Sequence, residues 1–105
     1  EKKHILQRLA NTLRGIVAQK LVPRADGRGR IAAGEIMINT PTVEKMIEDG
    51  HIGEIYNAIR EGEHWGMRTM NQCLYRYVQK QLITPEEAMN YAGIHSELRQ
   101  MLRRM

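Results

Sequence analysis

The sequence predicts an α+β fold in which an N-terminal helix and a β-hairpin precede a small all-helical bundle. Two observations support this prediction. Two segments rich in β-branched residues flank an Asp-Gly turn within residues 16–38, and this pattern is typical of a hairpin. After Asn39, apolar residues recur every three or four positions, which is typical of amphipathic helices. The total of 105 residues fits one domain.

The first third of the chain is expected to form one helix and two paired strands. Residues 5–16 place apolar side chains on one helical face. Residues 16–22 are rich in β-branched side chains and stop at Pro23, so they predict a strand. The Asp-Gly pair within residues 24–29 supplies the positive φ of a tight turn. Residues 30–38 are then the returning strand.

Short helices are expected in the rest of the chain. Thr40 and Thr84 each precede a proline, and this pair favours a helix start because the hydroxyl caps the first turn. The run TPEE that begins at Thr84 also fits a full capping box. Gly50, Gly62 and Gly93 are expected helix ends. The apolar residues of successive helices are Val43, Met46 and Ile47; Ile52, Ile55, Tyr56 and Ile59; Met67, Met70, Leu74, Tyr77 and Val78; Ala88, Met89 and Ala92; and Leu98, Met101 and Leu102.

Composition excludes several protein classes. No apolar run approaches the roughly 20 residues of a membrane-spanning helix, and the N-terminus has neither an initiator Met nor a signal peptide. The single cysteine, Cys73, cannot form an internal disulfide, which favours a reducing, cytosolic compartment. Residues 1–30 contain eight Lys or Arg and two acids, residues 31–70 contain three and seven, and residues 71–105 contain five and three. The basic first third could contact phosphates or pair with the acidic middle.

We expect no catalytic, cofactor-binding or metal-binding residue in this chain. The run GRGRIA at residues 27–32 matches a dinucleotide fingerprint, but that motif needs a helix where a strand is predicted. There is no G-x-x-x-x-G-K-[ST], and the four histidines lack metal-ligand spacing. Ser96 is expected to cap a helix and Cys73 to face a core, so no nucleophile–base pair is visible.

Two features favour binding instead of catalysis. Lys20, Arg24, Arg28 and Arg30 cluster on the predicted hairpin and could bind nucleic acid, although no aromatic residue lies among them. A solvated hairpin tip is the favoured interpretation. Trp65 lies between two glycines, where it would either pack over a helix end or, if exposed, anchor an interface. Packing is favoured for this residue.

Five segments, taken in order, resemble a known family. They are QRLANTLRG at 7–15, QKLVPRADGRGR at 19–30, EIMINTP at 35–41, GMRTMNQ at 66–72 and LITPEEA at 82–88. Over essentially its whole length the chain resembles the C-terminal region of the PilT/PilU type IV pilus retraction ATPases, which belong to the bacterial secretion ATPase superfamily.

The resemblance implies that residues 1–39 end a RecA-like ATPase core and that residues 40–105 form a C-terminal helical region. It implies a hexameric, ATP-driven motor of twitching motility, cytoplasmic and held at the inner membrane by pilus assembly proteins, without membrane insertion. ATP and Mg²⁺ would bind to motifs upstream of Glu1, so this chain alone would be inactive and would supply subunit contacts and force transmission. The hairpin would complete the edge of the ATPase sheet. Its candidate site residues are Arg24, Asp26, Gly27, Arg28, Gly29 and Arg30.

One segment departs from the family's pattern. Similar retraction ATPases have a helix A-I-R-N-L-I-R-E after N-T-P, and here that place is TVEKMIED. The apolar positions remain, but Glu44 and Glu48 replace both arginines, so the helix is carried over and its arginine contacts are not. The predicted interaction helix comprises Thr42, the packing residues Val43, Met46 and Ile47, and the partner-facing residues Glu44, Lys45 and Glu48.

Two alternatives remain open. A pilus-extension or type II secretion ATPase of the same superfamily would share the upstream motifs. Such proteins usually contain a four-cysteine zinc element, which Cys73 alone cannot supply, so the PilT/PilU branch is favoured. The alternative of another class is a free-standing basic module that binds nucleic acid through the hairpin arginines. Nucleic acid is the less favoured partner.

Overall fold

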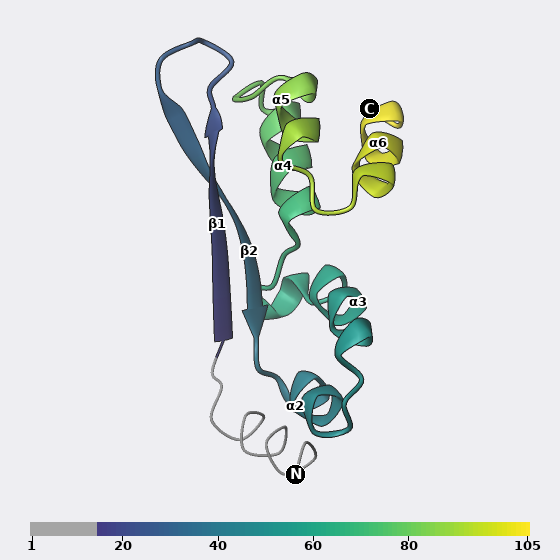
Figure 1. Cartoon of the computed structure of the whole chain (residues 1–105). Coiled ribbons are helices and arrows are strands. Elements are labelled where there is room, and N and C mark those ends of the chain that lie inside the picture. Colours follow the sequence, from purple (N-terminus) through teal and green to yellow (C-terminus); the bar gives the residue numbers. More distant parts are fainter. Residues whose placement is uncertain (1–14) are drawn as a thin grey trace. The chain divides into compact units, whose positions relative to one another are not determined.

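A computed structural model gives the fold of residues 15–105 (Figure 1). These residues form two compact units, each with an apolar core of its own. The first unit comprises residues 15–17 and 36–68, and the second comprises residues 18–35 and 69–105. The predicted N-terminal helix falls almost entirely on residues 1–14, which lie outside the described part of the chain. The boundary predicted after residue 39 stays a prediction.

The predicted hairpin is confirmed. β1 spans Gly15–Pro23 and β2 spans Arg30–Ile38, and the two strands form one sheet (Figure 1). The short turn between them makes the strands antiparallel. Gly15 allows the strands to approach, because a Cβ at this position would lie 2.8 Å from the carbonyl oxygen of Met37. With the helices that follow, this hairpin confirms the α+β fold class.

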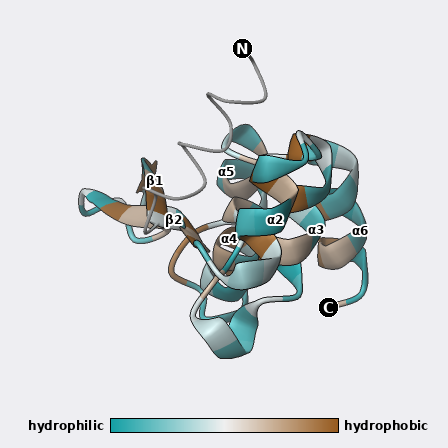
Figure 2. Ribbon diagram, turned by 90° about the horizontal axis from the view of Figure 1, so that it is seen from below, coloured by the Kyte–Doolittle hydropathy of each residue, from teal (hydrophilic) through white to brown (hydrophobic). Residues whose placement is uncertain are grey.

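Most of β1 is exposed. Its large apolar side chains Ile16, Val17 and Leu21 face solvent, and Val22 alone is fully buried. Figure 2 shows this strand coloured brown over part of its length, whereas the helices have both teal and brown residues along them. Within the described residues β1 therefore has an apolar character without a matching core on either side of most of its length.

Asp26 organises the turn between the strands. Its carboxylate forms an ion pair with Arg24 at 3.1 Å and accepts a hydrogen bond of 2.8 Å from the backbone N–H of Arg28. The Arg24 N–H donates to the carbonyl of Gly29 at 3.0 Å. Gly27 and Gly29 have φ of 72° and 84°, which only glycine adopts without strain. The hydrogen bonds from Arg24 and from the Arg28 backbone hold the pKa of Asp26 below its ordinary value.

The first unit folds around the end of β2. Thr40 caps its first helix as predicted, since the hydroxyl accepts a hydrogen bond of 3.3 Å from the Val43 N–H. The helix predicted from residue 52 is a 3₁₀ turn followed by a shorter α-helix. The elements are α2 (Pro41–Glu48), η1 (Ile52–Glu54), α3 (Ile55–Arg60) and η2 (Glu63–Trp65). The buried core consists of Met37, Val43, Ile47, Ile59 and Met67.

The second unit packs three helices with the turn end of the hairpin. These are α4 (Met70–Gln79), α5 (Pro85–Asn90) and α6 (His95–Arg103). Cys73 faces this core, as predicted. None of the helices within residues 15–105 combines the length and the apolar character needed to cross a bilayer. The buried core consists of Val22, Ala33, Met70, Cys73, Leu74, Val78, Ile83, Ala88, Ala92 and Leu98.

The predicted start of α4 at Met67 is wrong. Arg68 is extended and exchanges two backbone hydrogen bonds with Ile36 of β2, at 2.8 and 3.1 Å. Thr69 then caps the helix in a full capping box, in which its hydroxyl accepts from the N–H of Gln72 while the Gln72 side chain accepts from the Thr69 N–H. Met67 instead belongs to the core of the first unit.

The starts of the last two helices differ in how they are capped. Thr84 begins α5 as predicted, and its hydroxyl accepts a hydrogen bond of 3.1 Å from the Glu87 N–H. The predicted capping box is incomplete in this helix, because the Glu87 side chain does not accept from the Thr84 N–H. This helix ends at Asn90, earlier than the glycine expected to stop it. The capping role predicted for Ser96 is wrong, because α6 begins one residue before it and Ile94 is the N-cap, with no side-chain hydrogen bond.

Asn71 connects α4 to the segment between α5 and α6. This side chain is buried, and its amide nitrogen donates 2.9 Å hydrogen bonds to the Ile94 carbonyl and to the Glu97 carboxylate. Its amide oxygen accepts one from the Gly93 N–H, also at 2.9 Å. These hydrogen bonds hold the loop in place. Breaking one would leave a buried polar group unpaired inside a mostly apolar core, and that would cost free energy.

We predict that Leu74→Ala destabilises the chain by about 3 kcal/mol, because it removes a side chain with 0% exposure and leaves a cavity. The matched control is Leu21→Ala, the same chemical change at a side chain that is 57% exposed. It should change the free energy of unfolding by about 0.5 kcal/mol or less. Urea unfolding followed by circular dichroism measures both values, and equal losses would contradict the assigned core.

We also predict that Arg24→Gln raises the pKa of Asp26 toward its ordinary value, because the first cause of the lowering is removed. A carboxyl whose pKa is lower in the folded than in the unfolded state stabilises the folded state at pH values above its unfolded-state pKa. This contribution is lost as the pH falls through the folded-state pKa. NMR titration of the Arg28 amide, which donates a hydrogen bond to Asp26, reports the pKa of Asp26 in the original protein and in the variant. An unchanged titration in Arg24→Gln would show that the ion pair is absent in solution.

Candidate functional site

The predicted interaction helix is α2, and its residues divide between the core and the surface. Val43 and Ile47 are 0% and 2% exposed and pack in the first unit's core. Thr42 and Lys45 are exposed, while Met46 is half-buried. Glu44 and Glu48 are also half-buried. The helix thus presents one buried apolar edge and one mixed surface, and their role in binding stays a prediction.

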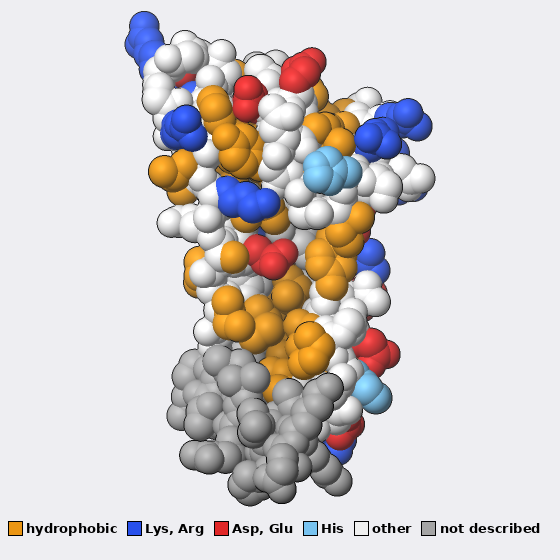
Figure 3. All heavy atoms as spheres, viewed as in Figure 1, with side chains coloured by type: hydrophobic (Ala, Val, Ile, Leu, Met, Phe, Trp, Pro, Cys, Tyr) orange, Lys and Arg blue, Asp and Glu red, His pale blue; other side chains and the backbone are white. Residues whose placement is uncertain are grey.

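A shallow hollow of about 450 Å³ lies against the exposed side of α2. Lys45 Nζ lies 3.6 Å from Asp49 Oδ1 across one helical turn, and this pair forms part of the rim. Just beyond the helix, His51 Nδ1 lies 3.1 Å from Glu54 Oε2. Acidic side chains lie along the α2–α3 edge of the face shown in Figure 3. The hollow is lined by Pro41, Thr42, Lys45, Met46, Asp49 and His51.

This hollow combines apolar and charged side chains. Met46 supplies a flexible apolar contact that adapts to different partners, and the rim supplies charged groups that orient a partner. No group of three or more His, Cys, Asp or Glu side chains that could hold a metal ion exists among residues 15–105. Contact with another protein through this side of α2 stays a prediction.

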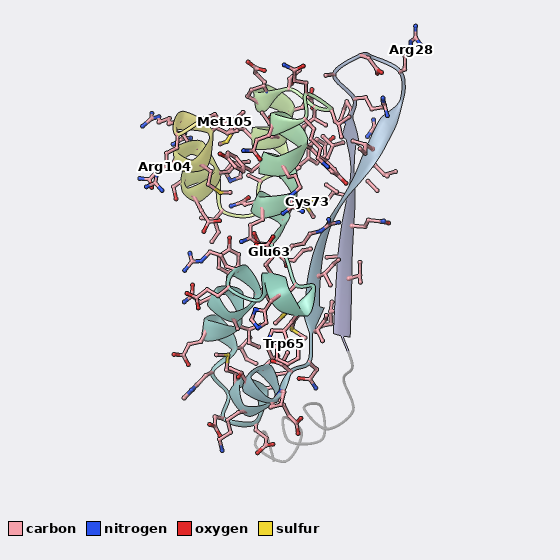
Figure 4. The ribbon with its side chains drawn as sticks, turned by 180° about the vertical axis from the view of Figure 1, so that it is seen from behind. Arg28, Glu63, Trp65, Cys73, Arg104 and Met105 are labelled. Carbon is pink, nitrogen blue, oxygen red and sulfur yellow. The ribbon has the colours of Figure 1, made fainter. Side chains whose placement is uncertain are left out.

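The hairpin arginines do not form a shared cationic patch. Arg24 is occupied by Asp26, and Lys20 Nζ donates a hydrogen bond of 3.0 Å to the Tyr91 carbonyl. Arg28 and Arg30 are exposed, and Figure 4 shows Arg28 at the tip of the turn pointing away from the protein. The site residues predicted on the hairpin, from Arg24 to Arg30, thus build the turn, and two of their guanidinium groups remain at its surface.

Trp65 is 53% exposed, so it does not pack over a helix end in the way the sequence favoured. It ends η2, and Gly66 follows with φ of 88°, which turns the chain sharply after the indole. The His64 ring lies beside it, with 5.4 Å between ring centroids. The flanking glycines were the available signal for this exposure, because they restrict the helix to a single turn with little surface to pack against.

The same chain is similar in sequence to curated pilus proteins. It is 37% identical over 95 residues to the type IV pilus ATPase PilU of Pseudomonas aeruginosa, covering 90% of this chain and 25% of PilU. It is 37% identical over 94 residues to the pilus retraction ATPase PilT of the same organism, covering 90% and 27%. A twitching motility protein of Neisseria gonorrhoeae is 36% identical over 92 residues, covering 88% and 25%. No family model matches the chain.

Solved structures give the same result. The crystal structure of the pilus retraction motor PilT with bound ADP superposes with a TM-score of 0.81 at 30% identity, over 93% of this chain and 26% of that one. The Legionella pneumophila ATPase DotB, at 22% identity and a TM-score of 0.62 over 81% and 23%, shares the fold. The chain spans about a quarter of the length of these relatives. Sequence and structure together show that the chain is homologous to the C-terminal part of the PilT/PilU-like type IV pilus ATPases.

Proposed function

We propose that this chain is the C-terminal part of an ATP-driven, hexameric type IV pilus retraction motor that supports twitching motility. Its task is to form subunit contacts and transmit force, with the motor located in the cytoplasm and held at the inner membrane by pilus assembly proteins. ATP and Mg²⁺ bind to other parts of the motor. The names of the relatives and the ADP in the PilT structure support this proposal. Residues 1–39 then end the RecA-like core, and residues 40–105 form the helical region.

The structural observation behind the proposed force-transmitting contact is the hollow beside α2. Val43 and Ile47 anchor this helix in the core, so that Thr42, Lys45 and Met46 are held at the surface in a fixed geometry. By its position directly after the run NTP, the helix corresponds to the arginine-containing helix that the resemblance implies for similar retraction ATPases. A movement of the ATPase core that displaces the first unit would therefore displace this surface with it.

The proposed partner of α2 would differ in charge from a partner that binds the arginines of similar retraction ATPases. Glu44 and Glu48 stand at the positions of those arginines and are half-buried on the helix. Like charges placed opposite each other disfavour a complex, whereas opposite charges favour it. We therefore infer a partner that presents basic or neutral polar groups to these carboxylates and an apolar side chain to Met46.

We predict that Met46→Asp abolishes twitching in the full-length protein and leaves its fold intact. Met46 is half-buried and lines the hollow, so the change in the free energy of unfolding should be about 1 kcal/mol or less. Ile47→Asp should instead cost about 4 kcal/mol, because it buries an unpaired charge. Thermal unfolding and the diameter of twitching zones measure the two effects.

Asn90→Asp, an exposed change at the end of α5, is the matched control and should alter neither quantity. If folded Met46→Asp protein supports normal twitching, α2 is not the partner-binding surface.

The direction of the motor's work is tested by removing the gene. We predict that the deletion strain keeps or accumulates surface pili and loses motility, because assembly continues without disassembly. Electron microscopy of the cells counts the pili. Loss of the pili would identify an extension motor, and normal pili with a secretion defect would identify a secretion ATPase. Re-introducing the gene is the control for each result.

A nucleic-acid-binding module is the weaker proposal. Of the basic residues clustered on the hairpin, Arg24 pairs with Asp26 and Lys20 bonds to a carbonyl. Arg28 and Arg30 remain without an aromatic platform beside them, and nonspecific binding that uses two phosphate contacts is weak at physiological salt.

A further inference from the structure

Trp65 is exposed, and the proposed role of α2 does not explain its exposure. It is the one tryptophan in the sequence, and slightly more than half of its surface faces solvent. Exposed indoles of this kind are frequent anchors of protein interfaces, because they bury a large area at a low cost in conformational entropy. The residues around the indole indicate which side chain of a partner would pack against it.

A hollow of about 170 Å³ opens beside the indole, within the first unit. Ala58, Gly62 and Met67 form its apolar part, and Glu61 lies at its edge. A side chain does not fit at Gly62, because a Cβ there would clash with the Met67 methyl group and lie 2.9 Å from the Ala58 carbonyl oxygen. Figure 4 shows Glu63 and Trp65 projecting from different sides of η2, and Glu63 is not among the residues that line the hollow.

The chemistry of this hollow suits an arginine side chain. A guanidinium stacks on an indole face and donates hydrogen bonds to a carboxylate, which Trp65 and Glu61 provide. The aliphatic stem of the arginine would contact Met67 and Ala58. Residues 41–68 contain six acids and three Lys/Arg, so the surrounding charge also favours a cation.

The second unit presents arginines of this kind on α6. Leu98 is fully buried in the core, so the opposite side of the helix faces solvent. Arg99 and Arg103 lie one turn apart on that side, and Arg104 follows. Within residues 15–105 none of these three guanidinium groups has a hydrogen bond or ion pair. Lys and Arg side chains gather over α6 in Figure 3, and Figure 4 shows Arg104 and Met105 at its end.

We propose that the hollow beside Trp65 and Glu61 binds the α6 arginines, chiefly Arg103, of a second copy of this chain. The contact joins two different surfaces, so repeating it from copy to copy builds a ring and not a closed pair. The inference deepens the subunit contacts of the proposed motor and rests on that proposed function. It names the two faces that meet.

The test measures self-association of the full-length protein by sedimentation velocity. Trp65→Ala, Glu61→Arg and Arg103→Glu should each weaken association at least tenfold, because each removes one part of the contact. Glu86→Arg and Lys80→Glu are matched charge reversals at exposed positions elsewhere and should leave association unchanged. Circular dichroism confirms that every variant is folded, and the solvent exposure of Trp65 makes this the expected result.

The decisive step mixes the Glu61→Arg and Arg103→Glu proteins. Each alone places like charges at the contact, but in an alternating mixture every hollow meets an α6 of opposite charge, and association should return. The fluorescence of Trp65, taken as the difference from Trp65→Phe, should shift to shorter wavelength as the mixture assembles.

Three outcomes would overturn the inference, and the first two separate it from the proposed function. If the variants associate like the original protein, or weaken without rescue in the mixture, α6 of a second copy is not the occupant, and the role of α2 in twitching stands on its own test. A protein that never self-associates would overturn both this contact and the hexamer.

Discussion

The register of β2 is the constraint on which both apolar cores depend. This strand supplies Ala33 to one core and Met37 to the other, and both side chains are buried. Since side chains alternate across a strand, a slip of one residue would turn both of them out of their cores. The turn held by Asp26 and the close approach of Gly15 to Met37 fix the pairing with β1. Further along, the Tyr77 hydroxyl donates a 2.7 Å hydrogen bond to the Ala32 carbonyl and holds α4 against the strand.

Elements with a local signal were predictable from the sequence. The strands, the Asp-Gly turn and the two Thr-Pro helix starts depend on residues that are neighbours in the chain, and the structure confirms them. The start of α4 was not predictable in this way. The apolar spacing continues back through Met67, and the pairing of Arg68 with Ile36, which are 32 positions apart, decides the boundary.

The candidate site shows the same division. Helical spacing identified Val43 and Ile47 as core residues, but it could not separate Met46 from them, because burial at the edge of a helix depends on where neighbouring segments end. No sequence pattern predicted the role of Asn71, since its hydrogen-bond partners lie 22 to 26 positions away in the chain. The exposure of Trp65 likewise depends on the single turn of η2 and the sharp bend at Gly66.

The exposed apolar strand β1 has a consequence for handling the protein. Ile16, Val17 and Leu21 lie on a strand whose outer backbone groups pair with no other strand in the described residues. Such an edge accepts any extended chain that reaches it, because backbone pairing and apolar burial are both satisfied at once. During refolding from denaturant, collisions between chains compete with folding, and yield should fall steeply with protein concentration. The same strand would be the natural place for a molecular chaperone to hold the chain until that edge is covered.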